Sequence, residues 1–241
     1  MLPDAIFRRI KQSASGKAIA LNDDDETPVA YSQESWWEYL LCKICEGKIK
    51  DYETYGFQML RGARHAQVHK HSSGLTFRNH RFREFKLFLT SLIWRAAVSS
   101  GIYFSKVIIP TELLEAPRKS LLDAKPLGPT QLGCKIMRLA DPTPVEEGGF
   151  PSQVLKQIVT SPFARLHGNT AYYSIVFIFE GFVFEFFVPA VPKVVRAQRG
   201  VHQRSKILSV PFVDFKSVPE LFKLMVAGYR KTQRGLVSFE N

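Results

Sequence analysis

The sequence predicts an α+β fold: a helical N-terminal half with a degenerate finger-like knuckle, packed on a C-terminal, mostly antiparallel sheet with flanking helices. Two patterns carry this prediction. Apolar residues recur at i, i+3, i+4 and i+7 spacing between Phe82 and Ser99, which is typical of a central helix with a wide apolar face. Two runs rich in Phe, Val and Ile flank Glu180-Gly181, and the whole segment 172–188 predicts a β-hairpin.

Two helices are predicted ahead of the central helix. The first is a short amphipathic helix from Pro3 to Ser13. The second ends at Gly62, and its start has two interpretations. Ser35 and Glu38 have the spacing of a capping box, which starts the helix at Trp36. Alternatively, residues 39–41 form a short strand and the helix begins near Cys45.

Beyond the central helix, Pro126, Gly128 and Pro129 mark a turn-rich link. This link divides the chain into a helical region at 1–125 and an α+β region at 126–241. The remaining predicted elements are helices at Thr111–Leu122 and Ser152–Val159, strands at Cys134–Leu139 and Ile207–Val213, and a final helix that opens at Ser217.

The apolar hairpin predicts how the sheet is covered. Its two strands are nearly continuously apolar, so we expect helices on both faces of the sheet. Glu185 interrupts the second strand. A buried carboxylate there needs a partner or a raised pKa, whereas an edge position that faces solvent explains it equally well, and the sequence leaves these explanations open.

The composition is that of an ordinary globular protein, with 45% hydrophobic and 23% charged residues. There is no run of about 18 apolar residues, so we expect no membrane span. A basic segment followed by an apolar run is also missing at the start, so we expect no signal peptide. Three cysteines are too few for a disulfide framework and favour a reducing, cytoplasmic location.

The net charge of +11 is concentrated in two segments, which favours a polyanionic partner such as DNA or RNA. Either segment is also compatible with a solvated loop. The first segment holds Arg61, Arg64, Lys70, Arg78, Arg81 and Arg83, and the second holds Lys193, Arg196, Arg199, Arg204 and Lys206 with no acidic residue.

Cys42 and Cys45 have the spacing of a zinc knuckle. His65 and His69 follow with a spacing suitable for two further zinc ligands, although the gap after Cys45 is longer than in an ordinary C2H2 finger. Two reduced, inert thiols and a redox-active pair are the alternatives.

Several segments together resemble a known group of proteins. These are Leu2-Pro3, LLCKICEGKIKDYETY from Leu40 to Tyr55, FKLFLTSLIWRA from Phe85 to Ala96, and GFVFEFFV from Gly181 to Val188. They are similar to uncharacterised bacterial proteins related to HNH-type, treble-clef zinc-finger endonucleases. The resemblance implies that Cys42, Cys45 and Glu46 match the second knuckle of that finger and that Tyr52, Glu53 and Tyr55 match the end of its helix.

The same resemblance exposes a departure. In the family, a histidine general base and a first cysteine pair stand ahead of the position of Leu2-Pro3, where this chain has no counterpart. His69 or His80 would then have to take the catalytic role. Zinc is the cofactor that the resemblance implies, and bacterial antiphage defence or a mobile element is the context.

Three functions follow. The first is a nucleic-acid-binding protein derived from an HNH-like nuclease, with DNA and RNA left open. The second is a catalytically inactive module that binds a protein partner, with exposed Trp36 and Trp37 as anchors. The third is an active metal-dependent nuclease. Phosphate-loop, dinucleotide-binding, serine-hydrolase and HExxH metalloprotease motifs do not occur in the sequence.

Overall fold

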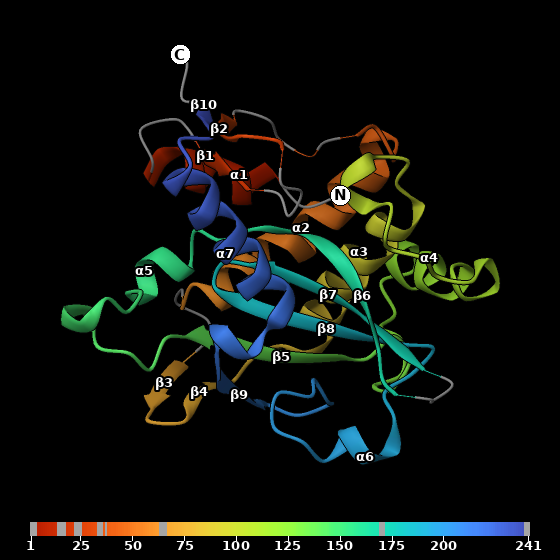
Figure 1. The fold of residues 1–241 in the computed structure, drawn as a ribbon. Coiled ribbons are helices and arrows are strands. Elements are labelled where there is room, and N and C mark those ends of the chain that lie inside the picture. Colours follow the sequence, from red (N-terminus) through yellow and green to blue (C-terminus); the bar gives the residue numbers. More distant parts are fainter. Residues whose placement is uncertain are drawn as a thin grey trace.

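A seven-stranded, mostly antiparallel sheet organises the chain (Figure 1). The computed structural model describes residues 4–13, 18–21, 26–32, 36, 38–62, 67–168 and 172–238. The strand order of the large sheet is β3-β4-β9-β5-β8-β7-β6, and only the β5–β9 pair is parallel. A second, three-stranded sheet has the order β1-β2-β10. These features confirm the predicted α+β class.

The strands are β1 (Ala18–Ala20), β2 (Val29–Ser32), β3 (Gln67–His71), β4 (Gly74–Arg78), β5 (Cys134–Ala140), β6 (Thr160–Leu166), β7 (Tyr173–Phe179), β8 (Phe182–Val188), β9 (Ile207–Asp214) and β10 (Val237–Ser238). The α-helices are α1 (Asp4–Ser13), α2 (Lys43–Leu60), α3 (Phe82–Val98), α4 (Glu115–Leu122), α5 (Ser152–Leu155), α6 (Lys193–Arg196) and α7 (Pro219–Gln233). Short 3-10 turns lie at Ile102–Phe104, Thr111–Leu113, Val145–Glu147 and Phe215–Ser217.

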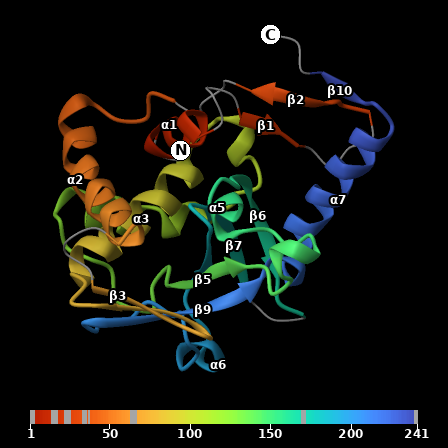
Figure 2. The same ribbon diagram turned by 90° about the vertical axis from the view of Figure 1, so that its left-hand side faces the viewer.

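The predicted hairpin forms β7 and β8, and every residue of β8 is buried. Glu180 and Gly181 both have positive φ, as a two-residue hairpin turn requires. Helices α2 and α3 cover one face of the sheet, and α5 and α7 lie on the other (Figure 2). The prediction that both faces are covered is therefore confirmed.

Helix α3 is the central helix, as predicted, and residues 85–96 are all buried. Its two buried cations, Lys86 and Arg95, both have partners. Lys86 donates to the carbonyl oxygens of Gln131 at 3.0 Å and Leu132 at 3.4 Å, and burial lowers the pKa of Lys86 to about 8. Arg95 forms ion pairs with two carboxylates of α2. The bonds run to Glu46 at 2.6 Å and to Glu53 at 2.9 Å.

The N-terminal half is less helical than predicted. Segment 61–86, for which a solvated loop before the central helix was one of two interpretations, contains the β3–β4 hairpin, and this hairpin extends the large sheet by pairing with β9. Helix α2 begins at Lys43, which agrees with a start near Cys45, and residues 39–41 form no strand. The sheet and the main apolar core take residues from both sides of the predicted 125/126 boundary, and that division stays a prediction.

Trp36 is half-buried and does not fit the exposed anchor that the protein-binding hypothesis expected. Its ring stacks on Tyr103 at 4.7 Å and packs edge-on against Phe7 at 5.1 Å. Trp37 lies outside the described residues. None of the helices described here has the length and apolar character needed to cross a membrane.

Candidate nucleic-acid interface

The two predicted basic segments meet at one end of the β4–β9 ladder. Arg78, the last residue of β4, is paired with Ile207, the first residue of β9. The chain leaves β4 through residues 79–81 and enters α3, while residues 201–206 lead into β9. Residues 79–82 and 204–206 line an open hollow of about 600 Å³. We refer to it as the basic hollow, since Arg81, Arg204 and Lys206 are part of its lining.

The backbone on the first side of the hollow is fixed by local contacts. Asn79 has a φ of 58°, a left-handed conformation that Asn tolerates better than most residues. The N–H group of Arg81 donates to the Tyr55 hydroxyl at 2.6 Å. The guanidinium of Arg81 lies over the Tyr55 ring, 4.4 Å from its centroid. Tyr55 of α2 therefore holds Arg81 in place at the start of α3.

The second side of the hollow is tied to β5. The N–H group of His202 donates to the carbonyl oxygen of Cys134 at 2.8 Å, and Val201 forms a bridge with Lys135. The Ser205 hydroxyl accepts a hydrogen bond from the N–H group of Ile207 at 3.0 Å. These contacts hold the segment before β9 beside the start of α3, with Arg204 and Lys206 exposed.

Two buried histidines lie beneath the hollow. His80 is 3% exposed and His202 is 1% exposed, and their ring centroids are 5.6 Å apart. None of their four ring nitrogens has a hydrogen-bond partner of good geometry among the described residues. Burial lowers the pKa of His80, an effect that the main chain of Lys206 partly offsets. Burial, Lys86 and His80 together lower the pKa of His202 well below its usual value. Both rings are therefore neutral at pH 7.

The lining of the hollow contains no carboxylate among the described residues. The nearest acidic contact is Glu84 in the first turn of α3, which lies 3.6 Å from Arg81 and 3.9 Å from Arg83. Both arginines are more than half exposed, so these pairs are weak and solvent-screened. The hollow keeps a net positive charge.

Other predicted basic residues extend this surface, and some do not belong to it. Figure 1 shows β3, β4, β9 and α6 along the lower side of the molecule. Lys70 on β3 and Lys193 and Arg196 on α6 are exposed. Arg199 binds Ser73 in the β3–β4 turn at 3.0 Å. Arg61 does not belong to this surface, because its guanidinium forms an ion pair with Glu180 at 2.6 Å. Arg64 lies outside the described residues.

Among the predicted zinc ligands that the structure describes, His69 lies apart from the cysteine pair. Cys42 and Cys45 lie at the start of α2, while His69 lies on β3, beyond the far end of this helix (Figure 2). Helix α2 has 18 residues, which corresponds to roughly 27 Å. His65 lies outside the described residues. In the part of the chain that the structure describes, no group of three or more His, Cys, Asp and Glu side chains is placed to hold a metal ion.

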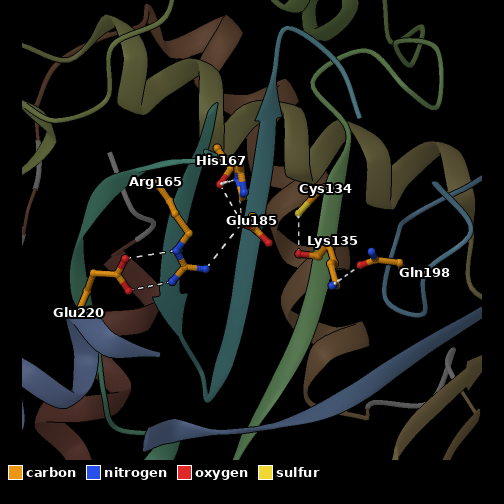
Figure 3. Close-up of polar contacts among 8 residues, drawn as sticks. Cys134, Lys135, Arg165, His167, Glu185, Gln198 and Glu220 are labelled. Carbon is orange, nitrogen blue, oxygen red and sulfur yellow. Dashed lines mark hydrogen bonds and ion pairs between the residues drawn. The ribbon is translucent and has the colours of Figure 1, made fainter. Parts of the chain in front are cut away.

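Glu185 lies on β8 and belongs to a second polar cluster, which is separate from the basic hollow (Figure 3). Its carboxylate accepts a hydrogen bond from the Ser174 hydroxyl at 2.8 Å and lies 3.5 Å from His167 and 3.7 Å from Arg165. Arg165 also binds Glu220 of α7 through two hydrogen bonds. Strand β8 lies between β5 and β7. Of the explanations for Glu185, the buried partner is therefore correct and the edge position is wrong.

Three residues of the interface were not expected from the sequence: Tyr55 as a support for Arg81, and Phe82 and His202 as a stacked pair. The rings of Phe82 and His202 are 4.9 Å apart with an angle of 16° between their planes. The only available signal was the position of His202 inside the second basic segment. No family model matches the chain, and neither a curated protein nor a solved structure is significantly similar to it.

Proposed function

We propose that the protein binds nucleic acid through the basic hollow and the exposed cations around it. One observation carries this proposal: two basic segments from distant parts of the sequence converge on a single hollow whose described lining has three cations and no carboxylate. Lys and Arg side chains that contact phosphates displace the condensed counterions of a nucleic acid, and this release supplies most of the sequence-independent affinity.

The geometry of the cations supports a phosphate-binding role. Arg81 is positioned by Tyr55 and keeps 57% of its side chain exposed, so its guanidinium is both oriented and accessible. Orientation lowers the entropy lost on binding. The two basic segments also hold the exposed residues Lys70, Arg78, Arg83, Lys193, Arg196 and Arg199, and in this proposal they contact further phosphates of the same strand.

The resemblance to HNH-type nucleases agrees with this proposal but is not required by it. We also propose a cytoplasmic location, because three cysteines are too few for a secreted disulfide framework.

Whether the protein also cleaves the bound nucleic acid is tested separately. Plasmid DNA and RNA are incubated with the protein and added magnesium, manganese or zinc. The variant His80→Ala tests whether the histidine that lines the hollow is required for cleavage.

The proposal is tested by the binding of fluorescently labelled DNA and RNA at low salt. The diagnostic variant is Arg204→Glu/Lys206→Glu, which reverses two exposed charges at the hollow. A matched control is Lys43→Glu/Lys50→Glu, which reverses two exposed charges on α2 and changes the net charge equally. We expect the hollow variant to bind about tenfold more weakly or worse, while the control keeps most of its affinity. Equal losses in both variants, or no binding by the unmodified protein, would contradict the proposal.

A further inference from the structure

The basic hollow offers more than positive charge. Besides Arg81, Arg204 and Lys206, its lining includes hydrogen-bonding side chains at Asn79 and Ser205 and one aromatic ring at Phe82. A flat patch of cations suffices for contacts to a phosphate backbone. An aromatic ring and neutral hydrogen-bonding groups are the features with which proteins bind an individual base.

Phe82 is held in a fixed orientation. It is the first residue of α3, it is half-buried, and His202 covers one of its faces at 4.9 Å. His202 is neutral and almost completely buried, so it backs the ring without adding charge. Because one face is covered, the part of Phe82 that reaches the hollow is its opposite face or its edge. A ring that is already fixed loses little conformational freedom when a base packs against it.

The hollow is open, with a volume of about 600 Å³. The cations stand on both sides of the hollow, with Arg81 on the α3 side and Arg204 and Lys206 on the β9 side. A phosphate that follows a base in the hollow therefore meets a cation in either direction along the strand.

We propose that the basic hollow binds one unpaired nucleotide of a single-stranded nucleic acid, with its base against Phe82 and its flanking phosphates on Arg81, Arg204 and Lys206. This inference rests on the proposed function and narrows it. A base inside a duplex is stacked and paired on both sides, so it cannot reach Phe82 without leaving the helix. Stacking on an aromatic side chain is possible for every base, so the hollow selects single strands without selecting a sequence.

The experiment compares single strands of DNA and RNA with duplexes of the same length, using the full chain. Phe82→Leu keeps an apolar side chain against His202 but removes the aromatic face, and Phe82→Tyr restores that face. Loss of stacking should weaken binding of single strands by about tenfold, leave duplex binding unchanged, and be reversed in Phe82→Tyr. A single strand carrying 5-iodouracil is also crosslinked by light to the unmodified protein, and the attachment site is mapped by mass spectrometry to residues 79–82.

The outcomes separate this inference from the proposed function. If single strands and duplexes bind equally well and Phe82→Leu behaves like the unmodified protein, the nucleotide inference is wrong while the proposed function stands. If no nucleic acid binds at low salt, the proposed function fails and the inference fails with it. If Phe82→Leu does not fold, the crosslink decides, and attachment away from residues 79–82 and 204–206 overturns the inference.

Discussion

Arg78 and Ile207 are paired in the β4–β9 ladder, and this pairing brings the two basic segments together. The apolar residues behind them set the register. Phe77 is paired with Leu208, and both are buried. A slip by one residue would move these side chains to the opposite face of the sheet, so burial of the core fixes which basic residues become neighbours. The interface is thus a consequence of core packing between segments that are distant in the sequence.

The packing of α2 on α3 makes a prediction for two glycines of the same helix. A Cβ atom at Gly56 would lie 2.3 Å from the Phe88 ring, whereas nothing lies within 4 Å of a Cβ at Gly47. We expect Gly56→Ala to destabilise the protein by about 1–3 kcal/mol through overpacking. Gly47→Ala should stabilise it by about 0.5–1 kcal/mol, because alanine favours the helix. Urea unfolding measures both changes, and a gain in stability from Gly56→Ala would contradict the α2–α3 contact.

The Glu53 carboxyl predicts a pH dependence of stability. Burial raises its pKa from 4.5 to about 7, although Arg95 acts in the opposite direction. At pH values between 4.5 and about 7, the Glu53 carboxyl is therefore protonated in the folded protein and ionised in the unfolded chain. The free energy of unfolding that this group contributes is therefore highest below about pH 4.5 and is lost as the pH rises to about 7, with a slope of at most about 1.4 kcal/mol per pH unit.

Glu53→Gln removes this contribution. We expect the difference in unfolding free energy between the unmodified protein and Glu53→Gln to change steadily between about pH 4.5 and about pH 7 and to be constant above that range. Glu46→Gln, which removes the other carboxylate bound to Arg95, serves as the control and should keep most of the dependence. A difference that does not vary with pH would show that the pKa of Glu53 is the same in the folded and the unfolded protein, which contradicts the prediction.

The three cysteines should react with a thiol reagent at different rates. Contacts from the N–H group and the thiol of Cys45 lower the pKa of Cys42, which is exposed, while the pKa of Cys45 is raised. Burial raises the pKa of Cys134 well above its usual value. We expect Cys42 to react first, because the thiolate is the nucleophile, and Cys134 to react only after unfolding. If Cys42 reacts only after a chelator is added, the prediction is wrong and the pair holds a metal ion.

Much of the fold could be predicted from the sequence where the pattern is strong and local. The central helix, the hairpin at 172–188 and the final helix are examples, since their apolar spacing or turn residues determine them. Strand β3 could not be predicted in this way. Its residues QVHKH are all exposed and lack alternation, and they form a strand only because β4 pairs beside them. Pairing of distant segments is not visible in local periodicity.

The candidate site was predictable in its charges but not in its geometry. Both basic segments are evident in the sequence, and Arg81, Arg204 and Lys206 were among the expected contacts. Their meeting depends on the β4–β9 register. The positions of Phe82, His202 and Tyr55 depend on contacts between α2, α3 and the segment before β9. Local residue patterns contain no information on such contacts, which explains why Arg61 was grouped with a surface to which it does not belong.

The most direct test of the account is the salt dependence of nucleic-acid binding. For a single strand, the logarithm of the binding constant should fall linearly with the logarithm of the salt concentration, with a slope of about −0.7 for each phosphate contacted. Arg204→Glu/Lys206→Glu should make this slope shallower by about 1.4, corresponding to two lost contacts, while Lys43→Glu/Lys50→Glu should leave it unchanged. Binding with no salt dependence, or with the same slope in both variants, would contradict the assignment of the basic hollow as the interface.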